Sequence, residues 1–234
     1  MVTRLTALSD LDRPTTAHGS FRCDDPDDRF LGVRMRAVFA EAKKYADLDP
    51  DQIEQLLDSD IHEVRVAAVS VMDAAARGRS TSDRRRQDLY ELYLRRHDRI
   101  DNWDLVDRAA PSVIGGRPYD RPRDPLYDLA RSADPWRRRS AITATYYFLQ
   151  RGQVDDTFEI AALLAADAHD LVHKAVGGWL REAGKHAAGM PRIALRFATE
   201  QFDQDTRRRY RALTAESATG AADAQRSDRS PRWT

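Results

Sequence analysis

The 234-residue sequence predicts an all-α fold, a solenoid of HEAT-like helical repeats. Three observations support this prediction. Apolar residues recur along most of the chain at the three- and four-residue spacing of amphipathic helices. The apolar/polar alternation of a half-buried strand is missing. Four segments also open alike, at separations near the lower edge of the HEAT and armadillo repeat range.

The predicted helices follow one another between turn and cap residues. Their apolar stripes fall in the ranges Ile53–Leu57, Val64–Met72, Leu89–Tyr93, Leu126–Ala130, Ala141–Phe148, Ile160–Leu164 and Leu171–Leu180. Breaks between them are indicated by Asp49-Pro50, Ser59-Asp60, Gly78, Gly115-Gly116, Gly152, Gly184 and Gly189. Shorter helices alternate with longer ones, which gives each repeat an A-helix and a B-helix.

The four similar segments begin at Asp60, Asp101, Asp134 and Asp167. Each aspartate is expected to be the N-cap of a B-helix, and each segment reaches a small alanine about two turns later. In a solenoid, equivalent helices of successive repeats line the concave face. Function therefore depends on the side chains that these B-helices send to that face.

Composition excludes several classes of protein. The single cysteine, Cys23, excludes an internal disulfide framework and a Cys-rich zinc site. His169 and His173 have the spacing of metal ligands on a helix, but no further ligand completes a site, so no metal is expected. No membrane helix or signal peptide is recognisable, and a cytoplasmic protein is expected.

Charge alone decides little about the partner. The formal net charge is zero, with basic runs at Arg84–Arg86, Arg137–Arg139 and Arg207–Arg209. Almost all basic residues are arginines, whose guanidinium groups suit phosphate, although a GC-rich coding genome produces the same bias.

Three regions are expected along the chain. Residues 1–29 form a partly irregular N-terminal segment, residues 30–215 form the repeat domain, and residues 216–234 form a disordered tail. The tail has almost no large apolar residue, so it cannot repay the entropy of ordering.

The candidate site combines one aromatic, one carboxylate and several cations on neighbouring B-helices. Trp103 and Asp107 stand four residues apart and share one helix face. Arg139 belongs to the next B-helix, and Lys174 and Trp179 belong to the one after it.

These stretches resemble signatures of the AlkD-like DNA alkylation repair glycosylases. The three strong matches are Asp101–Pro111 (DNWDLVDRAAP), Trp136–Ile142 (WRRRSAI) and Lys174–Lys185 (KAVGGWLREAGK). Weaker matches flank them at Phe30–Met35 (FLGVRM) and Met190–Glu200 (MPRIALRFATE). The resemblance spans residues 30–210, in order and at suitable separations.

The resemblance implies a cofactor-free, monofunctional glycosylase for N3- and N7-alkylated purines in duplex DNA. It implies a monomer, associated with the nucleoid, that holds the duplex in its concave groove without a base-flipping pocket. Trp103, Asp107 and Arg139 match the family's active-site residues. The residues expected to contact DNA are Trp179, Arg138, Lys174, Arg181, Arg65 and Arg34.

Two departures from the family pattern stand out. The family's second active-site tryptophan falls at the position of Gly178, whereas this chain has Trp179, about 100° further around the helix. The N-terminus also differs, because residues 15–28 form an acidic loop where the family has a longer helix and a Gly-rich stretch.

Removal of an alkylated purine can also be argued from the chemistry of these residues, independently of the family resemblance. An alkylated purine is already cationic and leaves without a general acid. A fixed carboxylate such as Asp107 can stabilise the oxocarbenium character of the sugar and orient water. Trp103 can form a wall beside the cationic nucleotide, and Arg139 can hold flanking phosphates.

Alternatives stay open. Asp107 could be a repeat-to-repeat salt bridge, for example with Arg139 itself. The whole protein could be an inactive DNA-structure-binding paralogue, as the Gly178/Trp179 change suggests, or a HEAT scaffold for other proteins. Without an enclosing pocket, bulky adducts are not excluded as substrates.

Overall fold

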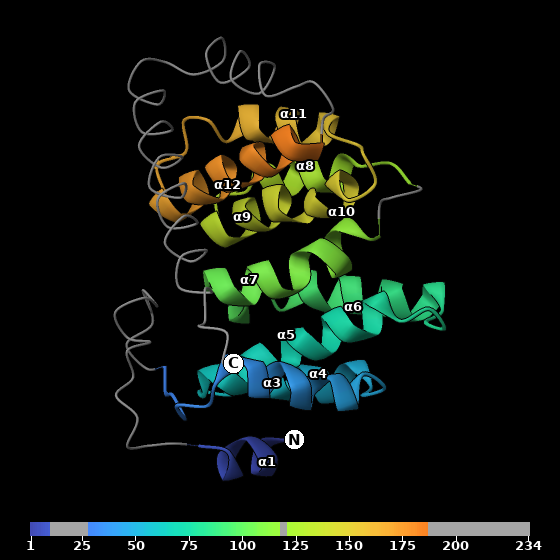
Figure 1. Cartoon of the computed structure of the whole chain (residues 1–234), viewed down its shortest axis with the longest axis vertical. Helices are drawn as coiled ribbons and strands as arrows, with labels where there is room; N and C mark the ends of the chain where they lie inside the picture. The colour runs from blue at the N-terminus through green and yellow to red at the C-terminus, as the bar shows by residue number, and fades with distance from the viewer. Residues whose placement is uncertain (10–27, 118–120, 187–234) are drawn as a thin grey trace, which may run out of the picture. The chain divides into compact units, whose positions relative to one another are not determined.

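The computed structural model describes residues 1–9, 28–117 and 121–186. These residues form an all-α helical-repeat fold, which confirms the predicted fold class (Figure 1). The α-helices are α1 (Val2–Ala7), α3 (Met35–Ala42), α4 (Pro50–Leu57), α5 (His62–Arg77), α6 (Asp83–Arg95), α7 (Trp103–Ala109), α8 (Asp124–Ala130), α9 (Pro135–Ala144), α10 (Tyr146–Leu149), α11 (Asp155–Leu163) and α12 (Asp170–His186). Short 3₁₀ turns cover Lys43–Tyr45 and His97–Arg99, and a π-helix covers Ala110–Gly115.

The chain divides into two compact units, Met1–Tyr147 and Phe148–Thr234. In the first unit, α5 is the central element, and almost every one of its residues is buried. It packs against α3 and α4 on one side and against α7 on the other (Figure 1). The next layer continues the pattern, because α7 packs against α9 and α9 against α8. The predicted A- and B-helices are thus seen as the pairs α4–α5 and α8–α9.

Helix α7 is short because the sequence after it cannot continue an α-helix. Pro111 has no backbone N–H to bond the carbonyl of Asp107, so the regular ladder ends at Ala109 and a π-helix follows. The π-helix ends at the buried Gly115, which faces the carbonyl of Ala144 at the end of α9 so closely that a Cβ would overlap it. Glycine therefore allows these two segments to touch.

Only one of the four predicted N-caps is confirmed. Asp134 caps α9 and accepts a hydrogen bond from the backbone N–H of Trp136 at 2.9 Å. Helix α5 is capped by Ile61 and α7 by Asn102, each one residue after the predicted aspartate. Asp60 pairs instead with Arg29 at 3.1 Å, and Asp101 faces Arg65. The Asp167 carboxylate accepts from the N–H of His169, before α12 begins.

In the second unit, α11 packs against α12. The buried side of α12 carries Val172, Ala175, Val176, Leu180 and Ala183. Its exposed side carries Lys174, Gly178 and Lys185, as the amphipathic pattern predicted.

Several predictions fall outside the part of the chain that the structure describes. They concern Cys23, most of the acidic loop, the Met190–Glu200 motif, Arg207–Arg209 and the tail. Across the described ranges, no helix is both long and apolar enough to cross a membrane.

Candidate active site

Helix α7 presents Trp103 and Asp107 on one half-buried face, as their spacing predicted. Three of its other residues, Leu105, Val106 and Ala109, are buried. The helix begins at Trp103 because the side chain of Asn102 accepts a hydrogen bond from the backbone N–H of Trp103 at 2.7 Å. The cap therefore fixes the backbone from which the indole projects.

The Asp107 carboxylate is held by Arg139 of α9. Arg139 Nε donates to Oδ1 at 3.0 Å, and Nη2 donates to Oδ2 at 2.7 Å, which is a bidentate ion pair. The hydroxyl of Thr143, one turn later on α9, donates to Oδ1 at 3.4 Å. The Arg139 side chain is only 8% exposed, whereas the Asp107 side chain is 32% exposed. Asp107 thus forms the salt bridge to Arg139 that the sequence left open as an alternative, and its side chain remains partly exposed.

This geometry changes what Arg139 does. The sequence suggested that Arg139 holds flanking phosphates. In the structure, its guanidinium lies in the interior with two of its N–H groups directed at Asp107. Arg139 is thus placed to orient the carboxylate of Asp107 and not to reach the surface.

A buried hydrogen-bond cluster anchors α9 beneath Arg139. The hydroxyl oxygen of Ser140 lies 2.9 Å from Tyr93 Oη and 3.0 Å from His97 Nε2. Burial lowers the pKa of His97 to about 4, partly offset by the charge of Asp134, and burial raises the pKa of Tyr93. Both side chains are therefore neutral at pH 7, as residues in a packed interior should be.

Arg65 is a wrong prediction as a DNA contact. Its side chain is 1% exposed, and Nη2 lies 2.7 Å from the carboxylate of Asp28 and 3.6 Å from Asp101. A guanidinium this deep cannot reach a phosphate. The sequence alone does not show whether Arg65 is buried or exposed. A position in the first turn of α5 can face either the protein interior or the solvent.

The other predicted cations of the first unit have different exposures. Arg34 is exposed at the N-cap of α3. Arg138 is half-buried, and its Nη1 donates to the carbonyls of Ser132 (3.0 Å) and Ala133 (2.7 Å) after α8. Arg34 is thus the more accessible of the two.

In the second unit, α12 presents the remaining candidates. Lys174 and Gly178 lie one turn apart on the exposed face, and Trp179 and Arg181 are half-buried. Among the residues that the structure describes, no atom lies within 4 Å of a Cβ built at Gly178. The described residues therefore leave space at the position where the resemblance to the family predicts tryptophan.

The sequence profile of the DNA alkylation repair enzymes matches residues 2–208. The chain belongs to the DNA alkylation repair enzyme family. This membership supports a role in DNA repair, and it confirms the resemblance seen in the motifs. No curated protein sequence matches the chain.

Arg108, beside the candidate site, is a residue that no sequence pattern indicated. Arg108 follows Asp107, and its guanidinium stacks on the Phe39 ring at 4.4 Å. Its Nε donates to Ser70 Oγ at 3.0 Å, and Nη2 lies 3.3 Å from Asp73. These contacts tie α7 to α3 and α5. Only the tertiary packing reveals them, because no spacing rule links residues 39, 70 and 108.

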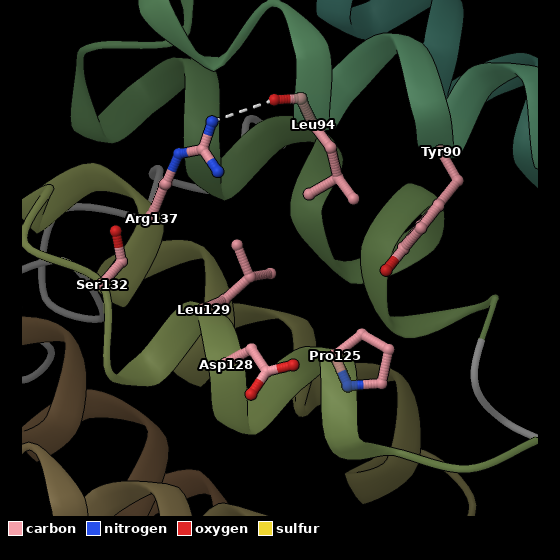
Figure 2. A pocket seen from close by; sticks show the side chains of 7 residues that line it. All are labelled: Tyr90, Leu94, Pro125, Asp128, Leu129, Ser132 and Arg137. Carbon is pink, nitrogen blue, oxygen red and sulfur yellow. Dashed lines mark hydrogen bonds between the residues drawn. The ribbon is translucent and has the colours of Figure 1, made fainter.

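A hollow in the first unit lies away from these residues. A pocket of about 360 Å³ opens between α6 and α8 (Figure 2). It is lined by Tyr90, Leu94, Pro125, Asp128, Leu129, Ser132 and Arg137. Arg137 turns away to the carbonyl of Leu94 at 3.1 Å. Among the described residues, no cluster of three or more His, Cys, Asp or Glu side chains could hold a metal ion.

Proposed function

We propose that this protein is a DNA glycosylase that excises N3- and N7-alkylated purines from duplex DNA, as a monomer and without a cofactor. The observation that carries the proposal is the Asp107 carboxylate. It is about one-third exposed, fixed by a bidentate contact from Arg139, and one helical turn from the half-buried Trp103.

The reaction asks little of the protein beyond a well-placed negative charge. Breaking the C1′–N bond returns the bonding electrons to the cationic purine, which leaves as a neutral base. Positive charge then develops on the deoxyribose, and water adds to C1′ and loses a proton. A carboxylate beside C1′ stabilises that charge and orients the water.

The contacts of Asp107 suit this role. Arg139 and Thr143 fix the carboxylate so that it does not have to reorganise as charge develops. Trp103 offers an electron-rich face to the cationic base, or a wall to its sugar. Arg34 and Lys174 are both exposed, so each of these charges is accessible to a phosphate.

The proposal is tested by base release from duplex DNA that carries one 7-methylguanine or 3-methyladenine. We expect the wild type to release the base and Asp107→Asn to lose about a hundredfold or more in rate, the cost of removing a transition-state contact. Asp128→Asn is the matched control, because this exposed carboxylate lies on α8 beside the pocket of Figure 2. Wild-type protein that binds the DNA but releases no base would end the proposal.

A second candidate function is recognition of DNA structure without catalysis. The open space at Gly178 favours it, since the family's second active-site aromatic is missing from that position. It predicts salt-dependent binding to duplex DNA with no base release. The same experiment, run with a binding measurement beside it, separates the two functions. A bulkier adduct on the same purine positions then defines the size of substrate accepted.

A further inference from the structure

A buried charge cluster lies where the start of α7 meets the start of α5. His62 is the first residue of α5 and is fully buried. Its Nε2 lies 2.7 Å from Asp104 Oδ2, and its Nδ1 lies 3.4 Å from Asp28 Oδ2. Arg65, one turn later, contacts Asp28 at 2.7 Å and faces Asp101 at 3.6 Å. Two side chains of α5 therefore reach the carboxylates on both sides of Trp103.

The backbone at Trp103 is fixed from both directions. Asp101 and Asp104 face α5, Asn102 caps the helix, and the second oxygen of Asp104 accepts from the N–H of Leu105 at 2.9 Å. Three of the four residues Asp101–Asp104 are thus held by their side chains. Trp103 is the one among them that projects toward the candidate site.

The cluster also fastens the segment that precedes α3. Glu63, next to His62, accepts hydrogen bonds from the N–H groups of Leu31, Gly32 and Val33. The Phe30 ring lies 5.1 Å from the His62 imidazole. His62 thereby stands between this segment and α7.

We propose that His62 is a positioning residue, which sets the placement of the Trp103 indole through its contact with Asp104. The effect of His62 on catalysis rests on the proposed function. Its effect on the placement of Trp103 rests on the geometry of the first unit alone. His62 itself touches no substrate.

The protonation state of the His62 imidazole controls its contact with Asp104. Three carboxylates, Asp28, Asp101 and Asp104, face the His62 and Arg65 side of α5, and the charges of Arg65 and Arg99 both act on Asp101. Burial favours neutral imidazole, but the hydrogen bond and charge of Asp104 and the charge of Asp28 outweigh both burial and Arg65, so the pKa of His62 is raised. Burial also raises the pKa of Asp101.

The sign of the pH effect follows. A histidine whose pKa is raised by folding keeps its full contribution below the unfolded value of about 6.5. The contribution is lost as the pH rises through the folded pKa. Alkaline pH therefore releases Asp104, and Trp103 loses its fixed placement.

The test follows Trp103 fluorescence from pH 6 to pH 10. The Trp103 signal is the difference between the wild type and Trp103→Phe, because Trp136, Trp179 and Trp233 remain in both proteins. We expect this signal to titrate with a midpoint above about 6.5. His62→Gln should abolish the titration, and Asp104→Asn should move the midpoint to lower pH. His97→Gln, which replaces an equally buried histidine, should leave it in place.

Each outcome decides the proposal. A Trp103 signal that is constant with pH, or a titration that survives His62→Gln, overturns it. If His62→Gln does not fold by circular dichroism, an unchanged midpoint in Asp104→Asn overturns it as well. The fluorescence requires no base release, so its result stands even if the glycosylase assay fails. In an active enzyme, His62→Gln should also lower the rate of base release about tenfold at pH 7, as a misplaced active-site group does.

Discussion

At the scale of single residues, the Asp107–Arg139 pair joins stability and chemistry in one contact. A guanidinium that bonds both carboxylate oxygens fixes the orientation of the group, which a single lysine ammonium does not. Because Arg139 is buried and Asp107 is partly exposed, the pair presents its negative end to the surface. The surface charge that a substrate meets is therefore that of the carboxylate.

Arg139→Lys tests whether the orientation of Asp107 matters. The variant keeps the positive charge but loses the two parallel hydrogen bonds, so we expect base release to fall about tenfold or more while DNA affinity changes little. Single-turnover excision and a binding titration measure the two effects. Arg137→Lys is the control, since Arg137 is not among the residues expected to contact DNA and its Nη2 donates to the carbonyl of Leu94 at 3.1 Å. A loss of affinity without a loss of rate would instead assign Arg139 to phosphate binding.

The residue scale also shows where sequence reasoning stops. The spacing of Trp103 and Asp107 placed both on one face, because helix geometry is local. Arg65 was assigned to DNA and lies in the interior, because its partners Asp28 and Asp101 come from distant segments. Burial of a charge depends on tertiary partners that no helical period encodes.

At the scale of elements, two glycines differ in the space around them. Gly115 ends the π-helix after α7, where a Cβ would overlap the carbonyl of Ala144 and crowd the Tyr147 side chain. Gly178 lies on the exposed face of α12, where a Cβ would meet nothing within 4 Å. The first glycine is required by packing, and the second is not.

Paired substitutions test this difference. Gly115→Ala should destabilise the protein by about 1–3 kcal/mol, because a backbone oxygen cannot move aside as a flexible side chain can. Gly178→Trp should leave stability unchanged or raise it by about 0.5 kcal/mol, since glycine is a poor helix former and the space is free. Urea unfolding of both variants at one pH measures the free energies. Equal effects at the two positions would contradict the packing described here.

Helix positions were predicted well and helix starts less well. The apolar stripes located α4, α5, α6, α8, α9, α11 and α12, because burying one face is what forms each helix. The caps shifted by one residue at α5 and α7, where Asp60 and Asp101 bond to Arg29 and face Arg65. A carboxylate near a helix start has several possible partners, and only the fold selects among them.

At the scale of the whole molecule, many arginines in the part of the chain described are paired inside the protein. Several arginines form ion pairs with carboxylates of the same chain. These pairs are Arg65 with Asp28, Arg95 and Arg96 with Glu54, Arg108 with Asp73, and Arg139 with Asp107. Others, such as Arg86 and Arg99, donate to backbone carbonyls. An arginine-rich sequence therefore does not by itself make a basic surface.

The salt dependence of DNA binding measures how many lysines and arginines contact phosphates. Each lysine or arginine that neutralises a phosphate contributes about 0.9 to the slope of log K against log salt. We expect Arg34→Gln and Lys174→Gln each to reduce the slope by about one, because both side chains are exposed. Arg95→Gln is the matched control: its side chain is 54% exposed but lies 2.6 Å from Glu54, so its charge is already neutralised and the slope should stay unchanged. Binding isotherms of undamaged duplex DNA at several salt concentrations give the slopes without any contribution from catalysis. A slope that falls equally in all three variants would mean that DNA responds to total charge rather than to these two positions.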